Sequence, residues 1–92
     1  MQKNYIDIGD GGGVLISDII CVIDADEATK SNITKKFIKK NNEEKNTVIP
    51  KKMISKINSL VITENHGNLR IYSSPMTLKL FSKRANEKEM ML

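Results

Sequence analysis

Lysine dominates the central third of the chain, where nine lysines lie between Lys30 and Lys56 and only Glu43 and Glu44 oppose them. The lysine ammonium is a flexible point charge suited to phosphate contact, whereas bidentate recognition of guanine favours arginine. The chain has only two arginines, Arg70 and Arg84. The pattern therefore predicts a surface that binds a polyanion through charge, with an affinity that falls steeply as salt is added.

The charge is unevenly distributed along the chain. The formal net charge is +4 at pH 7, but residues 1–27 are acidic and residues 28–56 strongly basic. Such a dipolar domain draws polyanions to one face, and it also lets the acidic face of one subunit meet the basic face of the next. Nucleic acid and a second copy of the chain are the two predicted partners. The simpler alternative is that the lysines only solvate an exposed helix.

Other residues that can carry chemistry favour structural roles. The glycines from Gly9 to Gly13 lack a third glycine in nucleotide-binding register, because Val14 occupies that place, and a strand pattern follows them instead of a helix. His66 is the only histidine and lies among turn-forming residues, so it is expected to be exposed. Without a nucleophile or a ligand spacing, the carboxylates are best interpreted as solvated strand ends: Asp7, Asp10, Asp18, Asp24 and Asp26. The sequence predicts no enzyme, cofactor or metal site.

The single cysteine, Cys21, lies in the apolar run 19–23 and is predicted to be a buried, inert thiol. No segment approaches the roughly 20 apolar residues of a membrane span, and the N-terminus lacks a signal-peptide pattern. We therefore expect a cytoplasmic protein with no membrane contact and no small-molecule ligand.

The chain's 92 residues suit one domain, 1–92, with an ordered core of about 4–84 and a frayed tail, 85–92. Residues 5–8, 14–16 and 19–23 read as short strands that form a small meander around the glycine turn. Ser31 is a plausible N-cap for an amphipathic helix that places Ile33, Phe37 and Ile38 inward. The outer face of this helix carries Lys35, Lys36, Lys39 and Lys40.

The second half of the sequence predicts a hairpin and a C-terminal helix. Residues 48–50 are expected to be extended, and residues 51–58 to form a loop or a single turn. Residues 60–63 and 69–72 are β-prone and are joined by turn formers. Pro75 suits the first turn of a helix that carries Leu78, Leu80 and Phe81. The fold class is therefore α/β (α+β): a small antiparallel or mixed sheet, a central amphipathic helix and a C-terminal helix.

Several collinear segments resemble a known family. They are Tyr5–Asp10, Ser17–Asp24, Ser31–Lys40, Arg70–Pro75 and the pair Lys83 and Arg84. Together, over roughly residues 4–84, they resemble the bacterial extracellular-matrix regulators RemA and RemB, and they are closer to the RemB branch. The resemblance implies a subunit that assembles into a ring-shaped homo-oligomer and binds DNA as a transcriptional regulator of biofilm-matrix genes.

The resemblance carries over the fold and the assembly better than the DNA contacts. In the RemA pattern, DNA contact is associated with an arginine near the second strand turn and with an arginine-rich loop before the hairpin. These positions fall here on Ser17 or Asp18 and on residues 55–58, so the arginines are absent. Lys56 keeps the charge in register, with Lys51 and Lys52 as possible substitutes upstream.

Two functions remain open from the sequence. The first is a regulator that contacts double-stranded DNA through lysines repeated around a homo-oligomer: Lys51, Lys52, Lys56, Lys35, Lys36, Lys39 and Lys40. The second is an oligomeric scaffold whose basic face binds a protein partner instead of DNA, in which case moderate salt is expected to dissociate it. A nucleotide-binding or enzymatic role at the glycine turn is a minor third alternative.

Overall fold

Strands and helices are interleaved through the computed structural model, which describes residues 4–9, 13–48 and 56–90. In chain order the elements are β1 (Tyr5–Ile6), β2 (Val14–Leu15), a 3-10 turn (Ile16–Asp18), β3 (Ile19–Asp24), α1 (Ala25–Ala28), α2 (Asn32–Glu43), β4 (Thr47–Val48), β5 (Ser59–Asn65), β6 (Asn68–Ser74) and α3 (Leu78–Met90). This confirms the predicted α+β fold class. Helix α3 runs through residues 85–90, which the sequence analysis assigned to a frayed tail.

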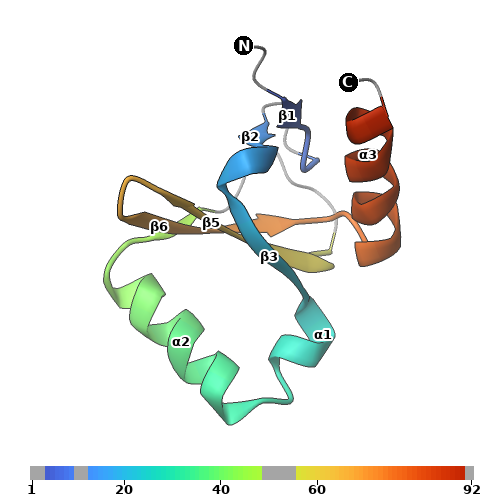
Figure 1. The fold of residues 1–92 in the computed structure, drawn as a ribbon. Coiled ribbons are helices and arrows are strands. Elements are labelled where there is room, and N and C mark those ends of the chain that lie inside the picture. Colours follow the sequence, from blue (N-terminus) through green and yellow to red (C-terminus); the bar gives the residue numbers. More distant parts are fainter. Residues whose placement is uncertain (1–3, 10–12, 49–55, 91–92) are drawn as a thin grey trace.

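The main sheet has four strands in the order β3-β5-β6-β4. Strands β3, β5 and β6 pair antiparallel, whereas β4 pairs parallel to β6. Strands β1 and β2 form a separate two-stranded sheet. Figure 1 shows the four-stranded sheet between two layers, with α2 on one face and α3 with β1 and β2 on the other.

The hydrophobic core lies on the face that α3, β1 and β2 cover. Side chains alternate along a strand, so Val61 and Tyr72, paired across β5 and β6, point to this same face. They pack with Ile6 and Ile8 from the N-terminal segment and with Phe81 from α3. The predicted terminal helix is confirmed, but it begins at Leu78, with Thr77 Oγ1 accepting a hydrogen bond from Leu80 N–H at 3.2 Å.

The hairpin of β5 and β6 confirms the predicted pairing and extends it. The turn contains two residues, His66 and Gly67, both with positive φ (50° and 84°). Two-residue hairpin turns need this conformation because its twist matches that of the strands. Gly67 accommodates it freely, and Glu64 Oε1 accepts a hydrogen bond from its N–H at 2.6 Å. His66 is exposed, as predicted.

The predicted N-terminal meander is wrong. Strand β3 does not continue the β1–β2 pair, because the 3-10 turn redirects the chain and β3 pairs with β5 instead. Strand β3 is thus an edge strand, and a register irregularity between Ile19 and Cys21 leaves Ile20 60% exposed. Cys21 is also exposed, which contradicts the predicted buried thiol. The apolar run 19–23 predicts a strand correctly but does not reveal that one face of it lacks a cover.

Helix α2 starts where the sequence predicts, since Ser31 Oγ accepts a hydrogen bond from Thr34 N–H at 3.2 Å. Its inward face differs from the prediction. Ile33 is 82% exposed, whereas Asn41 is buried. Asn41 Nδ2 donates to the Phe37 carbonyl at 2.9 Å, and Asn41 Oδ1 accepts from Asn46 Nδ2 at 3.1 Å. The helix therefore approaches the sheet at its C-terminal end and stands away from it at its first turn.

We expect two serines paired across the hairpin to differ in their effect on stability. Ser59 and Ser74 face each other and have no exposed surface. Ser74 Oγ donates to the Ile8 carbonyl and accepts from Met76 N–H at 3.1 Å, whereas Ser59 Oγ has no partner among the described residues. Ser74→Ala leaves two buried groups unsatisfied and is expected to lower the free energy of unfolding by about 1–3 kcal/mol.

Ser59→Ala is the matched control, since it removes a hydroxyl that satisfies nothing. It is expected to change the free energy of unfolding by less than about 0.5 kcal/mol, or to raise it. Urea unfolding of both variants measures the difference. Equal losses in the two variants would show that the Ser74 hydroxyl does not hold the N-terminal segment.

The exposure of Cys21 has a direct chemical test. An aromatic disulfide reagent is expected to modify the native protein at a rate similar to that of the urea-unfolded protein, because the thiol is open to solvent. Cys21→Ser supplies the background. Modification of Cys21 only after unfolding would contradict the exposed thiol and support the buried thiol that the sequence predicts.

Candidate nucleic-acid interface

Four lysines project from α2, all of them exposed: Lys35, Lys36, Lys39 and Lys40. None of them forms an ion pair with a carboxylate of the described residues. The helix carries only one acidic residue, Glu43, at its end. The structure therefore confirms the cationic outer face that the sequence predicts for this helix.

The four side chains span an arc of about 140° on the outward side of α2. Successive residues are rotated by about 100°, and Asn41 marks the side that faces the sheet. Lys35 and Lys39 lie on one flank, Lys40 lies on the other, and Lys36 points outward between them. The helix thus presents positive charge over a wide arc of its surface.

A polar hollow of about 350 Å³ adjoins the Lys40 flank, between the C-terminal end of α2 and the hairpin turn. Lys40 and Arg70 supply its cations, Glu44 supplies a carboxylate and Phe37 supplies an apolar wall. Arg70 is the residue that the sequence analysis missed. The hairpin pattern placed it on a strand, but nothing local in the sequence shows that this strand begins beside the C-terminal end of α2.

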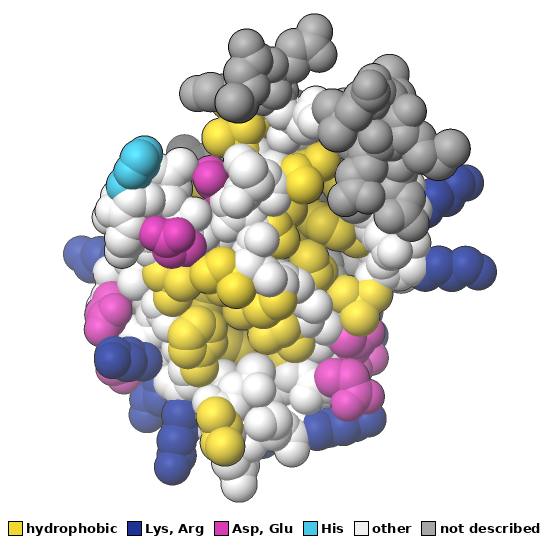
Figure 2. All heavy atoms as spheres, in the orientation of Figure 1, with side chains coloured by type: hydrophobic (Ala, Val, Ile, Leu, Met, Phe, Trp, Pro, Cys, Tyr) yellow, Lys and Arg dark blue, Asp and Glu magenta, His cyan; other side chains and the backbone are white. Residues whose placement is uncertain are grey.

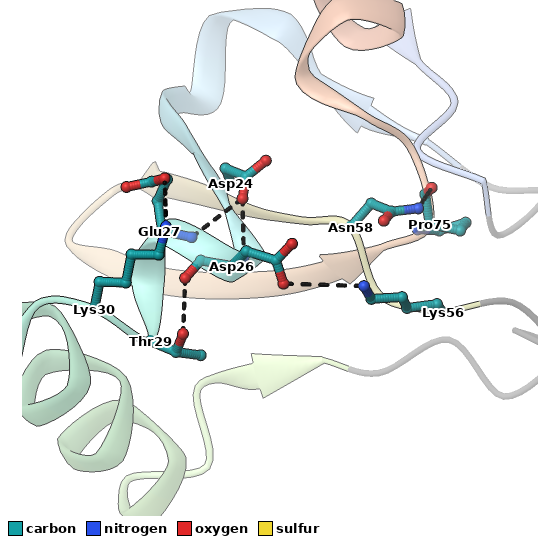
Figure 3. A network of polar contacts seen from close by, with 8 residues as sticks. All are labelled: Asp24, Asp26, Glu27, Thr29, Lys30, Lys56, Asn58 and Pro75. Atoms are coloured by element: carbon teal, nitrogen blue, oxygen red, sulfur yellow. Dashed lines mark hydrogen bonds and ion pairs between the residues drawn. The ribbon is translucent and has the colours of Figure 1, made fainter.

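The remaining predicted contacts are less available or lie elsewhere. Lys51 and Lys52 fall outside the described residues. Lys56 is exposed, and its Nζ lies 3.9 Å from Asp26 Oδ1 at the start of α1 (Figure 3). An exposed pair at this distance is weak and screened by salt. Arg84 is engaged in the fold, because its guanidinium donates to the Asp7 carbonyl at 3.2 Å and contacts Met76 Sδ at 3.4 Å.

The acidic third of the chain uses its described carboxylates internally. Asp24 caps α1 by accepting from the N–H groups of Asp26 (2.9 Å) and Glu27 (3.1 Å), and Glu27 pairs with Lys30 at 3.2 Å (Figure 3). Asp7 accepts from Gly9 N–H at 2.7 Å, and Asp18 accepts from Asn65 Nδ2 at 3.1 Å. Each described carboxylate of residues 1–27 therefore contacts its own chain, in contrast to the lysines of α2.

The residues with other possible chemistry take structural roles or form no site. Gly9 has a φ of 96° and lies against Pro75, where a Cβ would approach the ring carbon Cγ to 2.7 Å, so this position needs glycine. No group of three or more metal-ligating side chains occurs among residues 4–9, 13–48 and 56–84. No helix in the described part of the chain is both long and apolar enough to cross a bilayer.

No protein-family model matches this chain, and no curated protein matches it. The resemblance to RemA and RemB therefore stays a prediction from the collinear segments.

Proposed function

We propose that this protein binds double-stranded DNA through phosphate contacts from the lysines of α2. The observation that carries this proposal is that, within the described residues, the lysines of α2 have no ion-pair partner. The four α2 lysines are exposed and lack ion pairs, whereas the described carboxylates of the acidic third are engaged with their own chain. Because no described carboxylate forms an ion pair with these lysines, their positive charge is available to an external polyanion.

The dimensions of α2 suit a duplex. Its 12 residues span about 18 Å, and a B-DNA major groove about 12 Å wide admits one helix. Lysines across an arc of about 140° are suited to meet phosphates on both walls of a groove. Because the helix carries no arginine, charge is expected to contribute more to affinity than base recognition does.

We further propose that the protein acts as a transcriptional regulator of extracellular-matrix genes and binds as a homo-oligomer. The resemblance to RemA and RemB supports both parts. Edge strand β3 supports the homo-oligomer, because it has six residues with an apolar run, and its outer edge pairs with no other strand of the described residues. Such an edge is suited to pairing with another chain. Repeating the α2 lysines around an oligomer raises their effective concentration on one DNA molecule.

The exposed edge of β3 also favours the second candidate, an oligomeric scaffold whose basic face binds a protein. The two candidates differ in the role of α2. In the scaffold its lysines lie within a protein interface, so neutralising them or adding moderate salt is expected to dissociate the assembly. In the DNA-binding protein the assembly survives both changes, and sedimentation separates the alternatives.

A charge-matched pair of variants tests the DNA interface. Lys36→Gln with Lys40→Gln removes two charges from α2, and Lys79→Gln with Lys83→Gln removes two exposed charges from α3, on the other face of the sheet (Figure 1). For the α2 pair we expect weaker binding and a log-affinity against log-salt slope reduced by about 0.9 for each lost phosphate contact. Fluorescence anisotropy on A·T-rich and G·C-rich duplexes at several salt concentrations measures both quantities.

The α3 pair is expected to leave the slope unchanged. Equal losses in the two pairs would show that DNA responds to net charge alone, and α2 would not be the interface. Absence of binding by the unmodified protein at low salt would exclude the DNA function and leave the scaffold.

A further inference from the structure

A second recess, which we name the α2 cleft, lies on the opposite flank of α2 from the polar hollow. It has a volume of about 480 Å³ and lies between α1, α2 and the face of the sheet toward α2, where Leu60 is half-buried and Ile71 is buried. Ile38, Leu60 and Ile71 form its apolar floor. Figure 2 shows apolar side chains gathered on this face between α2 and β3, with basic side chains along the border formed by α2.

The cleft follows from the way α2 is attached. The helix is held near the sheet at its C-terminal end, where Asn41 and Asn46 bond to each other and Ile71 N–H donates to the Asn46 carbonyl at 2.9 Å. Towards its first turn the helix stands away from the strands, as the exposure of Ile33 shows (Figure 1). The small side chain of Ala28 at the end of α1 leaves this space open.

The charged side chains that line the cleft are both positive. Lys35 and Lys39 line it from α2, and both are exposed. Ser73 lines it from β6 and is 8% exposed, and its hydroxyl makes no hydrogen bond to a described residue. Thr47 Oγ1 and Asn42 Oδ1, which also line the cleft, are bonded to each other at 2.9 Å. An apolar floor with two ammonium groups suits a ligand with an apolar body and an anionic end.

We propose that the α2 cleft binds a medium-chain carboxylate, with the chain on Ile38, Leu60 and Ile71 and the carboxylate paired with Lys35 and Lys39. The volume of the cleft falls in the range of about 300–1,000 Å³ that is usual for small-molecule sites. A partner helix, which is about 10–12 Å across with its side chains, is a larger occupant than such a site usually holds. A phosphodiester backbone would bury its charge against the apolar floor, which is costly. The sequence predicts no small-molecule ligand because the cleft arises only from tertiary packing.

A bound carboxylate has a consequence for the proposed DNA contact, and this step rests on the proposed function. It pairs with Lys35 and Lys39 and offsets one of the four positive charges of α2, so ligand and DNA compete for the same lysines. By linkage, each lowers the affinity for the other by the same factor. The cleft would then make DNA binding respond to an amphipathic carboxylate.

The experiment is a titration of the ¹⁵N-labelled protein with octanoate, followed by amide chemical shifts. Octanol is the uncharged control for the ligand. The variant Lys35→Gln with Lys39→Gln removes the two lysines of the cleft, and Lys36→Gln with Lys40→Gln removes the same charge from α2 outside the cleft. We expect octanoate to cause saturable shifts at the cleft-lining residues. Octanol is expected to bind at least about tenfold more weakly. The affinity for octanoate is expected to fall by a similar factor in the Lys35 and Lys39 variant and to stay unchanged in the Lys36 and Lys40 variant. Anisotropy with octanoate present then measures competition with DNA.

Shifts that do not saturate, equal binding of octanol, or equal losses in the two double variants would each overturn the proposal. Concentration-dependent changes at the cleft residues without octanoate would show a second copy of the chain occupying the cleft, and would also overturn it. The octanoate titration contains no DNA, so failure of the DNA function leaves the ligand site testable. Octanoate binding without competition would retain the site and refute only its link to DNA.

Discussion

The arrangement of this protein depends on one buried hydroxyl, that of Ser74 at the end of β6. It donates to the Ile8 carbonyl and accepts from Met76 N–H, so it joins the N-terminal segment, the central hairpin and the approach to α3. Asn58 strengthens the same junction, because its N–H donates to the Ser74 carbonyl at 2.8 Å and its Nδ2 to the Pro75 carbonyl at 2.8 Å. These contacts close one face of the sheet, and Ile62 and Ile71 are buried on the other face.

Helix α2 contributes no side chain to the hydrophobic core cluster. It contributes Asn41, not a row of apolar side chains, to the residues buried in the fold, and it holds to the sheet through amide hydrogen bonds near its C-terminal end. This attachment leaves its lysines projecting to both flanks and leaves the α2 cleft on one of them. The proposed anion contact and the proposed ligand site thus share one cause, a helix fixed at one end only.

Local patterns in the sequence predict the local structure well. Ser31 starts α2 as a capping residue should, and the turn formers around His66 predict the hairpin. The failures concern contacts between distant segments. Nothing local shows that β3 pairs with β5 at a sheet edge, so the exposure of Cys21 was missed. The lysines of the site were predictable from composition and spacing, whereas Arg70 and the cleft required the tertiary arrangement.

The order of strands in the main sheet also bears on how the fold forms. Strands β5 and β6 are joined by a two-residue turn, so closing that hairpin costs little chain entropy. Strand β3 meets β5 only after residues 25–58 have been looped out, which is a larger entropic cost and a non-local contact. We therefore expect the hairpin to form first and β3 to dock later. Until it docks, the apolar run 19–23 is exposed along both edges, which makes the newly synthesised chain most prone to aggregation at this stage.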